Sequence, residues 1–212
     1  MTTATSLGYE DLPRLLDRLN GDEKHDPSSY STLDVLWVLY DRVLGDDDRF
    51  LLSKGHGPAA YYAVLAARGL FPEEWLDDFG TFVSPLGYHP DRALVPGVEI
   101  ASGSLGHGLP IAIGVALAGR SVYVLVGDGE LDEGSNWEAI QYAGRIGLER
   151  LTVVAVDNMS ATHGWPGGIE ARFLTEGWTA ERVDGRDHDA LERALRAGGA
   201  GRPHLVVAEV RQ

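Results

Sequence analysis

Two apolar runs, "SVYVLVGDG" and "RLTVVAVDN", restrict the fold of this chain more than any other feature. Both are rich in Val and Leu and lack the apolar–polar alternation of a half-exposed strand, which predicts two strands buried on both faces. A helical pattern at 135–147 lies between them. Two parallel strands need a crossover, and a helical crossover is right-handed. The sequence therefore predicts a βαβ unit.

The rest of the chain extends this pattern into a three-layer α/β fold, with one parallel sheet and helices on both faces. We expect a single domain over residues 1–212, without repeats or an internal linker. "GDEKHDPSS" and "ATHGWPGGIEARFLTEGW" are interpreted as loops. The other predicted strands are 49–52, 177–185 and 203–210, and the other predicted helices are 9–20, 33–44, 58–69, 72–79, 109–118 and 187–199.

Charge and composition exclude several classes of protein. The net charge is −14, whereas a protein that binds nucleic acid or a membrane surface needs a basic footprint. There is no cysteine, which excludes disulfides and thiolate metal sites. The longest apolar stretch, 109–118, is too short to span a bilayer, and the N-terminus lacks the pattern of a signal peptide. We expect a soluble cytoplasmic protein with no nucleic-acid or membrane partner.

The stretch "GDGELDEGSNWEA" combines glycines with acids directly after a predicted strand. Asp128 and Asn158 each follow one of the two buried strands, and parallel sheets bind ligands at the carboxyl ends of their strands. A carboxylate and an amide oxygen suit Mg²⁺ or Ca²⁺, and Gly127 and Gly129 permit close approach of a phosphate group. The alternative is an ordinary turn in which Asp128 caps the following segment.

The same stretch is part of a longer pattern. "GDG" followed by "DN" resembles the diphosphate signature of thiamine diphosphate enzymes, and "RFLLSKGHG", "HPD", "PGVE" and "GSLGHG" precede it in a consistent order. Together these strings resemble the transketolase family from about residue 20 to the end. They match its N-terminal, diphosphate-binding half, and most closely the short subunit of split transketolases. The resemblance implies the thiamine diphosphate-binding fold, as a PP-type domain.

By this resemblance, Asp128, Asn158 and the backbone carbonyl of Ser160 would bind Mg²⁺, for which Ca²⁺ or Mn²⁺ could substitute. Diphosphate binding is then expected to depend on the metal, because a bare carboxylate would repel the diphosphate. Glu130 and Asp132 are interpreted as solvated acids. The residues implied to bind thiamine diphosphate are His56, Gly103, Leu105, Gly129 and Asn158.

The resemblance also implies four catalytic residues. His56 would contact the diphosphate and the reacting centre, and His89 would bind oxygens of the donor substrate. His25 would hold donor or acceptor hydroxyls, although its surroundings depart from the family's glycine-rich motif and a surface histidine stays open as an alternative. Glu133, with Glu138, matches acids at a dimer interface that links two active sites; the alternative is a solvated helix start.

Three departures from the family pattern concern the substrate. His107 stands where Gln is usual, "DGRD" stands where "DGHD" is common, and the loop "ATHGWPGGIEARFLTEGW" is shorter than usual. The candidates for binding a substrate phosphate are Lys54 and Arg92.

The family pattern also implies a partner. The sequence ends at "HLVVAEVRQ", before a family segment with another active-site histidine, and the pyrimidine-binding domain is absent from it. We expect a chain that is inactive alone and pairs with a separate C-terminal transketolase-like subunit carrying that domain, as α₂β₂.

The expected reaction is transfer of a two-carbon ketol unit from a ketose donor to an aldehyde acceptor, with the carbanion chemistry supplied by the cofactor. Decarboxylative acyl transfer from a 2-keto acid such as pyruvate, in a specialised pathway, stays open as an alternative. A non-catalytic, cofactor-binding scaffold subunit is the alternative from another class. A nucleotide-binding regulator is disfavoured, because the phosphate-binding "GxxxxGK[ST]" pattern is missing.

Overall fold

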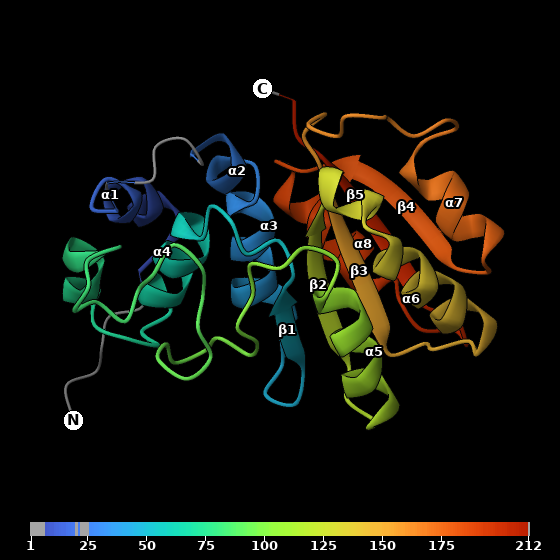
Figure 1. Ribbon diagram of the computed structural model, residues 1–212, viewed down its shortest axis with the longest axis horizontal. Helices are drawn as coiled ribbons and strands as arrows, with labels where there is room; N and C mark the ends of the chain where they lie inside the picture. The colour runs from blue at the N-terminus through green and yellow to red at the C-terminus, as the bar shows by residue number, and fades with distance from the viewer. Residues whose placement is uncertain (1–6, 20, 22–25, 212) are drawn as a thin grey trace.

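The computed structural model describes residues 7–19, 21 and 26–211. Within them, one parallel five-stranded sheet has the order β1-β2-β3-β5-β4 and extends from the middle of the molecule to one side of it (Figure 1). All neighbouring strands are parallel, which confirms the predicted sheet. The strands are β1 (Arg49–Leu52), β2 (Val122–Gly127), β3 (Leu151–Asp157), β4 (Thr179–Asp184) and β5 (His204–Glu209).

Helices cover both faces of this sheet and complete the three predicted layers (Figure 1). On one face, the core contains side chains of α1 (Leu12–Leu16), α3 (Leu33–Val38), α4 (Ala59–Ala67) and α8 (His188–Arg196). On the other, it contains side chains of α5 (Gly108–Leu117), α6 (Gly134–Arg145) and α7 (Ile169–Thr175). The remaining elements are α2 (Asp26–Tyr30), the 3₁₀ turns η1 (Tyr9–Asp11), η4 (Glu73–Asp78) and η5 (Gly129–Asp132), and the π turn η3 (Leu39–Val43).

The central strands β2 and β3 are buried on both faces, as their unbroken apolar sequences predict. In β3, Val154 and Val156 belong to one core, and Val153 and Ala155 belong to the other. The two strands pair directly. Their neighbouring carboxyl ends bring the residues that follow them to the same edge of the sheet.

Two segments interpreted as loops contain helices. The stretch 21–29 overlaps α2, where Ser29 is buried and donates a hydrogen bond to the carbonyl of Gly57 at 2.8 Å. The stretch 161–178 contains α7, which buries Ile169 and Phe173 against the sheet. Isolated helices this short are unstable in water, so contacts with distant residues stabilise both. Local periodicity therefore did not reveal them.

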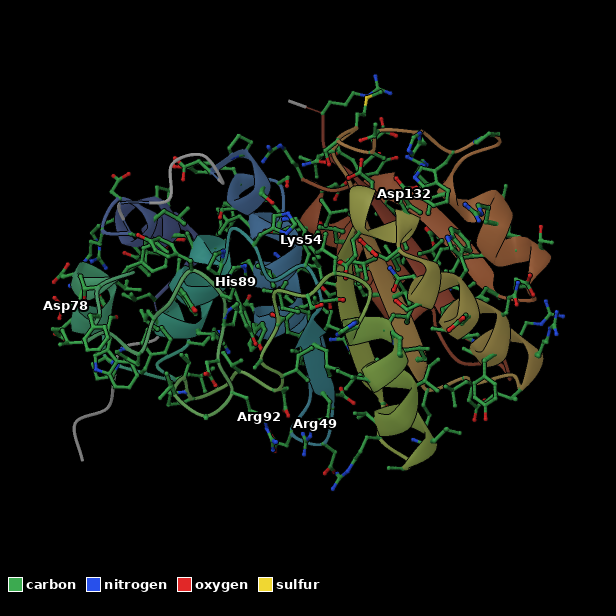
Figure 2. The ribbon with its side chains drawn as sticks, in the orientation of Figure 1. Arg49, Lys54, Asp78, His89, Arg92 and Asp132 are labelled. Carbon is green, nitrogen blue, oxygen red and sulfur yellow. The ribbon has the colours of Figure 1, made fainter. Side chains whose placement is uncertain are left out.

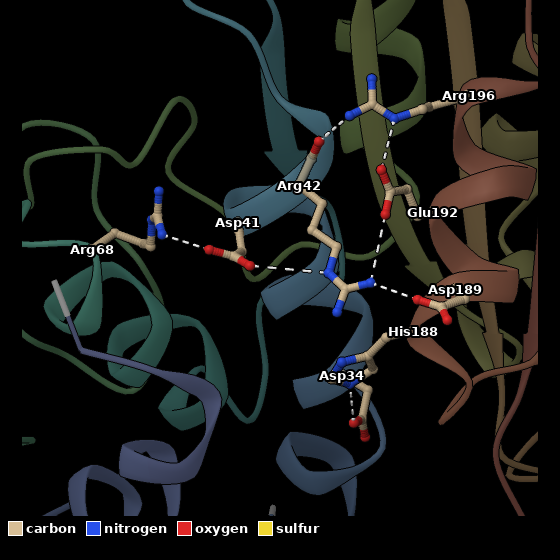
Figure 3. Close-up of polar contacts among 8 residues, drawn as sticks. All are labelled: Asp34, Asp41, Arg42, Arg68, His188, Asp189, Glu192 and Arg196. Atoms are coloured by element: carbon tan, nitrogen blue, oxygen red, sulfur yellow. Dashed lines mark hydrogen bonds and ion pairs between the residues drawn. The ribbon is translucent and has the colours of Figure 1, made fainter.

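Polar contacts join η3 and α3 to α8 across a face of the molecule (Figure 3). Arg42 is paired with Asp189 at 2.8 Å and with Glu192 at 3.5 Å. These pairs are partly exposed and contribute at most about 1 kcal/mol each. Asp34 is instead buried and lies 2.8 Å from Nε2 of His188. These contacts link α3 and η3 to α8.

Gly144 provides a test of how α6 packs. A Cβ atom there would lie 1.9 Å from the carbonyl oxygen of Glu176 and 3.1 Å from the buried ring of Trp178. We expect Gly144→Ala to lower the free energy of unfolding by about 1–3 kcal/mol, because the backbone of α6 must move away. Gly114→Ala in α5 is the matched control, since its Cβ would meet nothing within 4 Å. Urea denaturation of both variants is the measurement, and equal stability would contradict the prediction.

Candidate active site

Five segments from distant parts of the sequence meet at the carboxyl ends of the central strands. One segment follows β1, one follows β2 and one follows β3, while the other two belong to the long connection between α4 and α5. Hydrogen bonds and close backbone contacts join neighbouring members of this set. The segments are 53–57, 87–91, 102–108, 127–130 and 158–161.

The side chains of the predicted metal ligands converge in this arrangement. Asp128 is only 1% exposed, and its carboxylate accepts hydrogen bonds from Gly129 N at 2.9 Å, Ser160 Oγ at 2.6 Å and Ala161 N at 2.9 Å. The amide oxygen of Asn158 accepts a bond from Ser160 N at 3.3 Å. Ser160 thus connects the two side chains on neighbouring strands. The bond from Gly129 also makes Asp128 the cap of η5, so the turn interpretation and the ligand interpretation are compatible.

These residues fit a hard divalent cation. They offer a carboxylate, an amide oxygen and a backbone carbonyl, and Mg²⁺ takes few protein ligands of this kind. All three direct hydrogen-bond donors to Asp128 are neutral, so a cation would compensate its buried charge. Met159, between the other two ligands, has a φ of 60°, which is uncommon for a residue with a side chain. In the described part of the chain, no three His, Cys, Asp or Glu side chains form a metal cluster, so the oxygen set is the relevant candidate.

Close backbone contacts bring two predicted histidine segments together. A Cβ on Gly55 would lie 2.5 Å from Gly103 N, so the turn containing His56 presses on the "GSLGHG" loop. Gly103 has a φ of +137°, and a Cβ there would lie 2.7 Å from Cδ2 of His89. His56 is half-buried and His89 is exposed. His56, His89 and Gly103 therefore lie in one neighbourhood, and their roles stay predictions.

Three further predicted residues, Leu105, Glu133 and Glu138, lie in the described part of the chain. Leu105 is half-buried in the same loop. Glu133 is exposed, and its stem packs beside Gly106, where a Cβ would lie 2.7 Å from Cβ of Glu133. Glu138 is exposed on α6. His25 lies outside the described residues.

The prediction that Glu130 is a solvated acid is wrong. Glu130 is 2% exposed, and its carboxylate accepts hydrogen bonds from Ser53 Oγ, from Gly106 N at 2.9 Å and from Gly127 N at 3.4 Å. Burial raises the pKa of Glu130, and these hydrogen bonds oppose the shift. Asp132 is exposed, as expected. One carboxylate thus joins three of the five segments.

Lys54 is also buried at this edge, with 5% of its surface exposed. Its ammonium donates to the carbonyl of Ser28 at 2.8 Å. Burial lowers the pKa of Lys54 to about 8, although the charges of Glu130 and Asp128 act to raise it. The other sequence candidate for a substrate phosphate, Arg92, is exposed on the surface connection (Figure 2).

An aromatic cluster missed by the sequence analysis flanks the site. The guanidinium carbon of Arg172 lies 3.0 Å from the ring centroid of Trp137 and 4.7 Å from that of Trp165. Trp165 and Met159, together with Asp128, line a cavity of about 630 Å³. The cluster joins α6, α7 and the segment after β3, and no local pattern predicts it because its members are far apart in sequence.

The sequence analysis also missed Ser53 as a residue of the site. Its position directly after a strand, at the carboxyl edge of the sheet, is the signal that could have identified it.

Comparisons with known proteins identify the family of this chain. Residues 40–210 match the family model described as "Transketolase, thiamine diphosphate binding domain". The chain belongs to the transketolase family. It is 36% identical to an apulose-4-phosphate transketolase subunit of Actinobacillus succinogenes, over 87% of this chain and 75% of that protein. It is 52% identical to "Ferredoxin fas2" of Rhodococcoides fascians, over 97% of this chain and 73% of that protein.

The fold of this transketolase-family chain matches solved transketolases as well. Superposition on transketolase from Leishmania mexicana gives a TM-score of 0.75 with 25% identity, covering 97% of this chain. The chain spans 37% of the length of that transketolase. The predicted thiamine diphosphate-binding fold is thereby confirmed. In the described residues, no helix has the length and apolar character needed to cross a membrane.

Proposed function

We propose that this chain is the diphosphate-binding subunit of a split, thiamine diphosphate-dependent transketolase. In this proposal it transfers a two-carbon ketol unit from a ketose donor to an aldehyde acceptor. The convergence of Asp128, Asn158 and Ser160 within a transketolase-family domain carries the proposal. The relative from Actinobacillus succinogenes, which is named as one subunit of a transketolase, supports the split arrangement.

Each group of residues has a proposed task. Asp128, Asn158 and the carbonyl of Ser160 hold Mg²⁺, or Ca²⁺ or Mn²⁺ in its place, and the metal neutralises the diphosphate. Gly129 places its amide at the diphosphate, while Gly103 and Leu105 line the cofactor. When bound, thiamine diphosphate supplies the carbanion chemistry.

The histidines bind the substrate in this proposal. His56 contacts the diphosphate and the reacting centre, His89 binds donor oxygens, and His25 binds donor or acceptor hydroxyls. Imidazole suits these tasks because its pKa lies near ambient pH and both ring nitrogens can form hydrogen bonds.

The partner is proposed to be a separate subunit that carries the pyrimidine-binding domain, in an α₂β₂ assembly. Glu133 and Glu138 are exposed and are free to face another chain. Helix α5 buries one side and leaves Ile111 44% and Leu117 56% exposed on the other. In this proposal, these two side chains are candidate contacts for the partner.

A substrate comparison with the reconstituted pair tests this function. We expect ketose phosphate with an aldehyde acceptor to give the chain-extended ketose without release of CO₂. Pyruvate should give no product. Release of CO₂ from pyruvate, with no turnover of ketoses, would instead support decarboxylative acyl transfer. Absence of turnover with both donors, despite bound cofactor, would support a scaffold role.

The name of the relative "Ferredoxin fas2" raises a further question about electron transfer. Iron–sulfur clusters are held mainly by cysteine thiolates. The 212 residues here include no cysteine, so they supply no thiolate ligand for such a cluster.

A further inference from the structure

Two side chains of opposite charge, Glu130 and Lys54, are buried at the proposed cofactor-binding edge, and the proposed function leaves them without a role. Glu130 joins the segments that follow β1 and β2 to the "GSLGHG" loop through Ser53, Gly127 and Gly106. A nearby positive charge stabilises a buried carboxylate in addition to its hydrogen bonds. Lys54 follows Ser53 directly and provides it.

The side chain of Lys54 extends this connection to α2 (Figure 2). Its stem crosses the end of β2, where a Cβ on Gly127 would lie 3.0 Å from Cδ of Lys54. Its ammonium reaches the carbonyl of Ser28, and Ser29 returns a hydrogen bond to Gly57 in the turn after β1. Lys54 therefore holds α2 against the same turn that contains a predicted catalytic histidine.

The charge of Lys54 also acts on the edge itself. Glu130 and Asp128 are both buried, and both interact electrostatically with Lys54. Without this cation, the edge would present two carboxylates to an incoming diphosphate. Like charges a few ångströms apart repel by several kcal/mol in a protein environment, so the balance of charge here controls the affinity for anions.

We propose that Lys54 is a positioning residue whose positive charge balances Glu130 and Asp128 and thereby sets the affinity of this edge for the diphosphate of the cofactor. The inference rests on the proposed function, because it takes thiamine diphosphate with Mg²⁺ as the ligand. Glu130 holds the three segments together, and Lys54 makes their arrangement compatible with a bound anion.

A double-mutant cycle on the full chain tests this. Lys54→Met, Glu130→Gln and the double variant are compared by thermal unfolding without cofactor and by calorimetric titration with Mg²⁺ and thiamine diphosphate. We expect each single variant to lower Tm by roughly 6–20 °C, because it leaves a buried charge unpaired, and the double variant to lose much less than the sum. Arg193→Met, an exposed change of the same charge, is the control and should keep the Tm.

Cofactor affinity separates an electrostatic role from a structural one. Lys54→Met should bind at least about tenfold more weakly than the unchanged chain, because the charges of Glu130 and Asp128 are then unbalanced. The double variant restores the net charge of this edge and should recover part of that loss. Glu130→Gln keeps the cation and should lose clearly less affinity. Additive Tm losses, or equal loss of affinity in both single variants, would overturn the inference. If the unchanged chain binds no cofactor, the proposed function fails, while the Tm cycle still tests the pair.

Discussion

Asp128→Asn is expected to weaken binding of thiamine diphosphate with Mg²⁺ by about 100-fold or more, with the fold retained. Asp128 is the single charged member of the proposed ligand set, and losing a paired, buried charge typically costs about 3–5 kcal/mol. The asparagine oxygen can still accept from Gly129 N and Ser160 Oγ, so most of the local hydrogen bonding is preserved.

The measurement is calorimetric titration of the cofactor in the presence of Mg²⁺, together with thermal unfolding. Asp132→Asn removes the same charge from an exposed position in the same turn and should change the affinity little. A chelator added to the unchanged chain should abolish binding, because Asp128 then faces the diphosphate directly. Full affinity in EDTA would rule out the metal, and full affinity of Asp128→Asn would rule out its proposed ligand.

Turnover is expected only when a pyrimidine-binding subunit is added, with a rise of at least about 100-fold over the purified chain. The proposed ligands for the diphosphate end of the cofactor lie within the described residues of this chain. The proposal assigns the acid that activates its pyrimidine end to the partner, and one general acid or base contributes about 10²–10⁴-fold. The solved transketolase from Leishmania mexicana is a longer chain, of which this chain spans 37%.

The measurement is ketose turnover by the chain alone, the partner alone and the mixture, at saturating cofactor. Addition of the partner to an Asp128→Asn chain is the matched control and should restore little activity. A second control is calorimetric titration of the chain alone with the cofactor. It shows whether a chain without turnover still binds thiamine diphosphate. Robust turnover by the purified chain would refute the requirement for a partner.

The central part of the fold and of the site could be predicted from the sequence for simple physical reasons. Strands buried on both faces must be apolar throughout, so β2 and β3 are visible as unbroken runs. Because parallel strands carry ligands at their carboxyl ends, Asp128 and Asn158 could be placed together without coordinates.

Other features depend on contacts that no local pattern contains. The acid Glu130 has the sequence context of a surface residue, and its burial depends on Ser53, 77 residues earlier, and on Gly106, 24 residues earlier. Helix α7 is too short for a clear periodicity and depends on Ile169 and Phe173 packing on the sheet. The burial of Glu130 and the formation of α7 both depend on contacts between residues that are distant in sequence, and the sequence spacing does not predict such contacts.

The strand order has a consequence for how the free chain behaves in solution. β1 and β4 form the two borders of the sheet, where unpaired backbone groups could recruit strands of other molecules. β1 has only four residues, and β4 carries the charged side chains Glu181, Arg182 and Asp184. Short and charged borders discourage strand addition, so the sheet itself resists fibril-like aggregation.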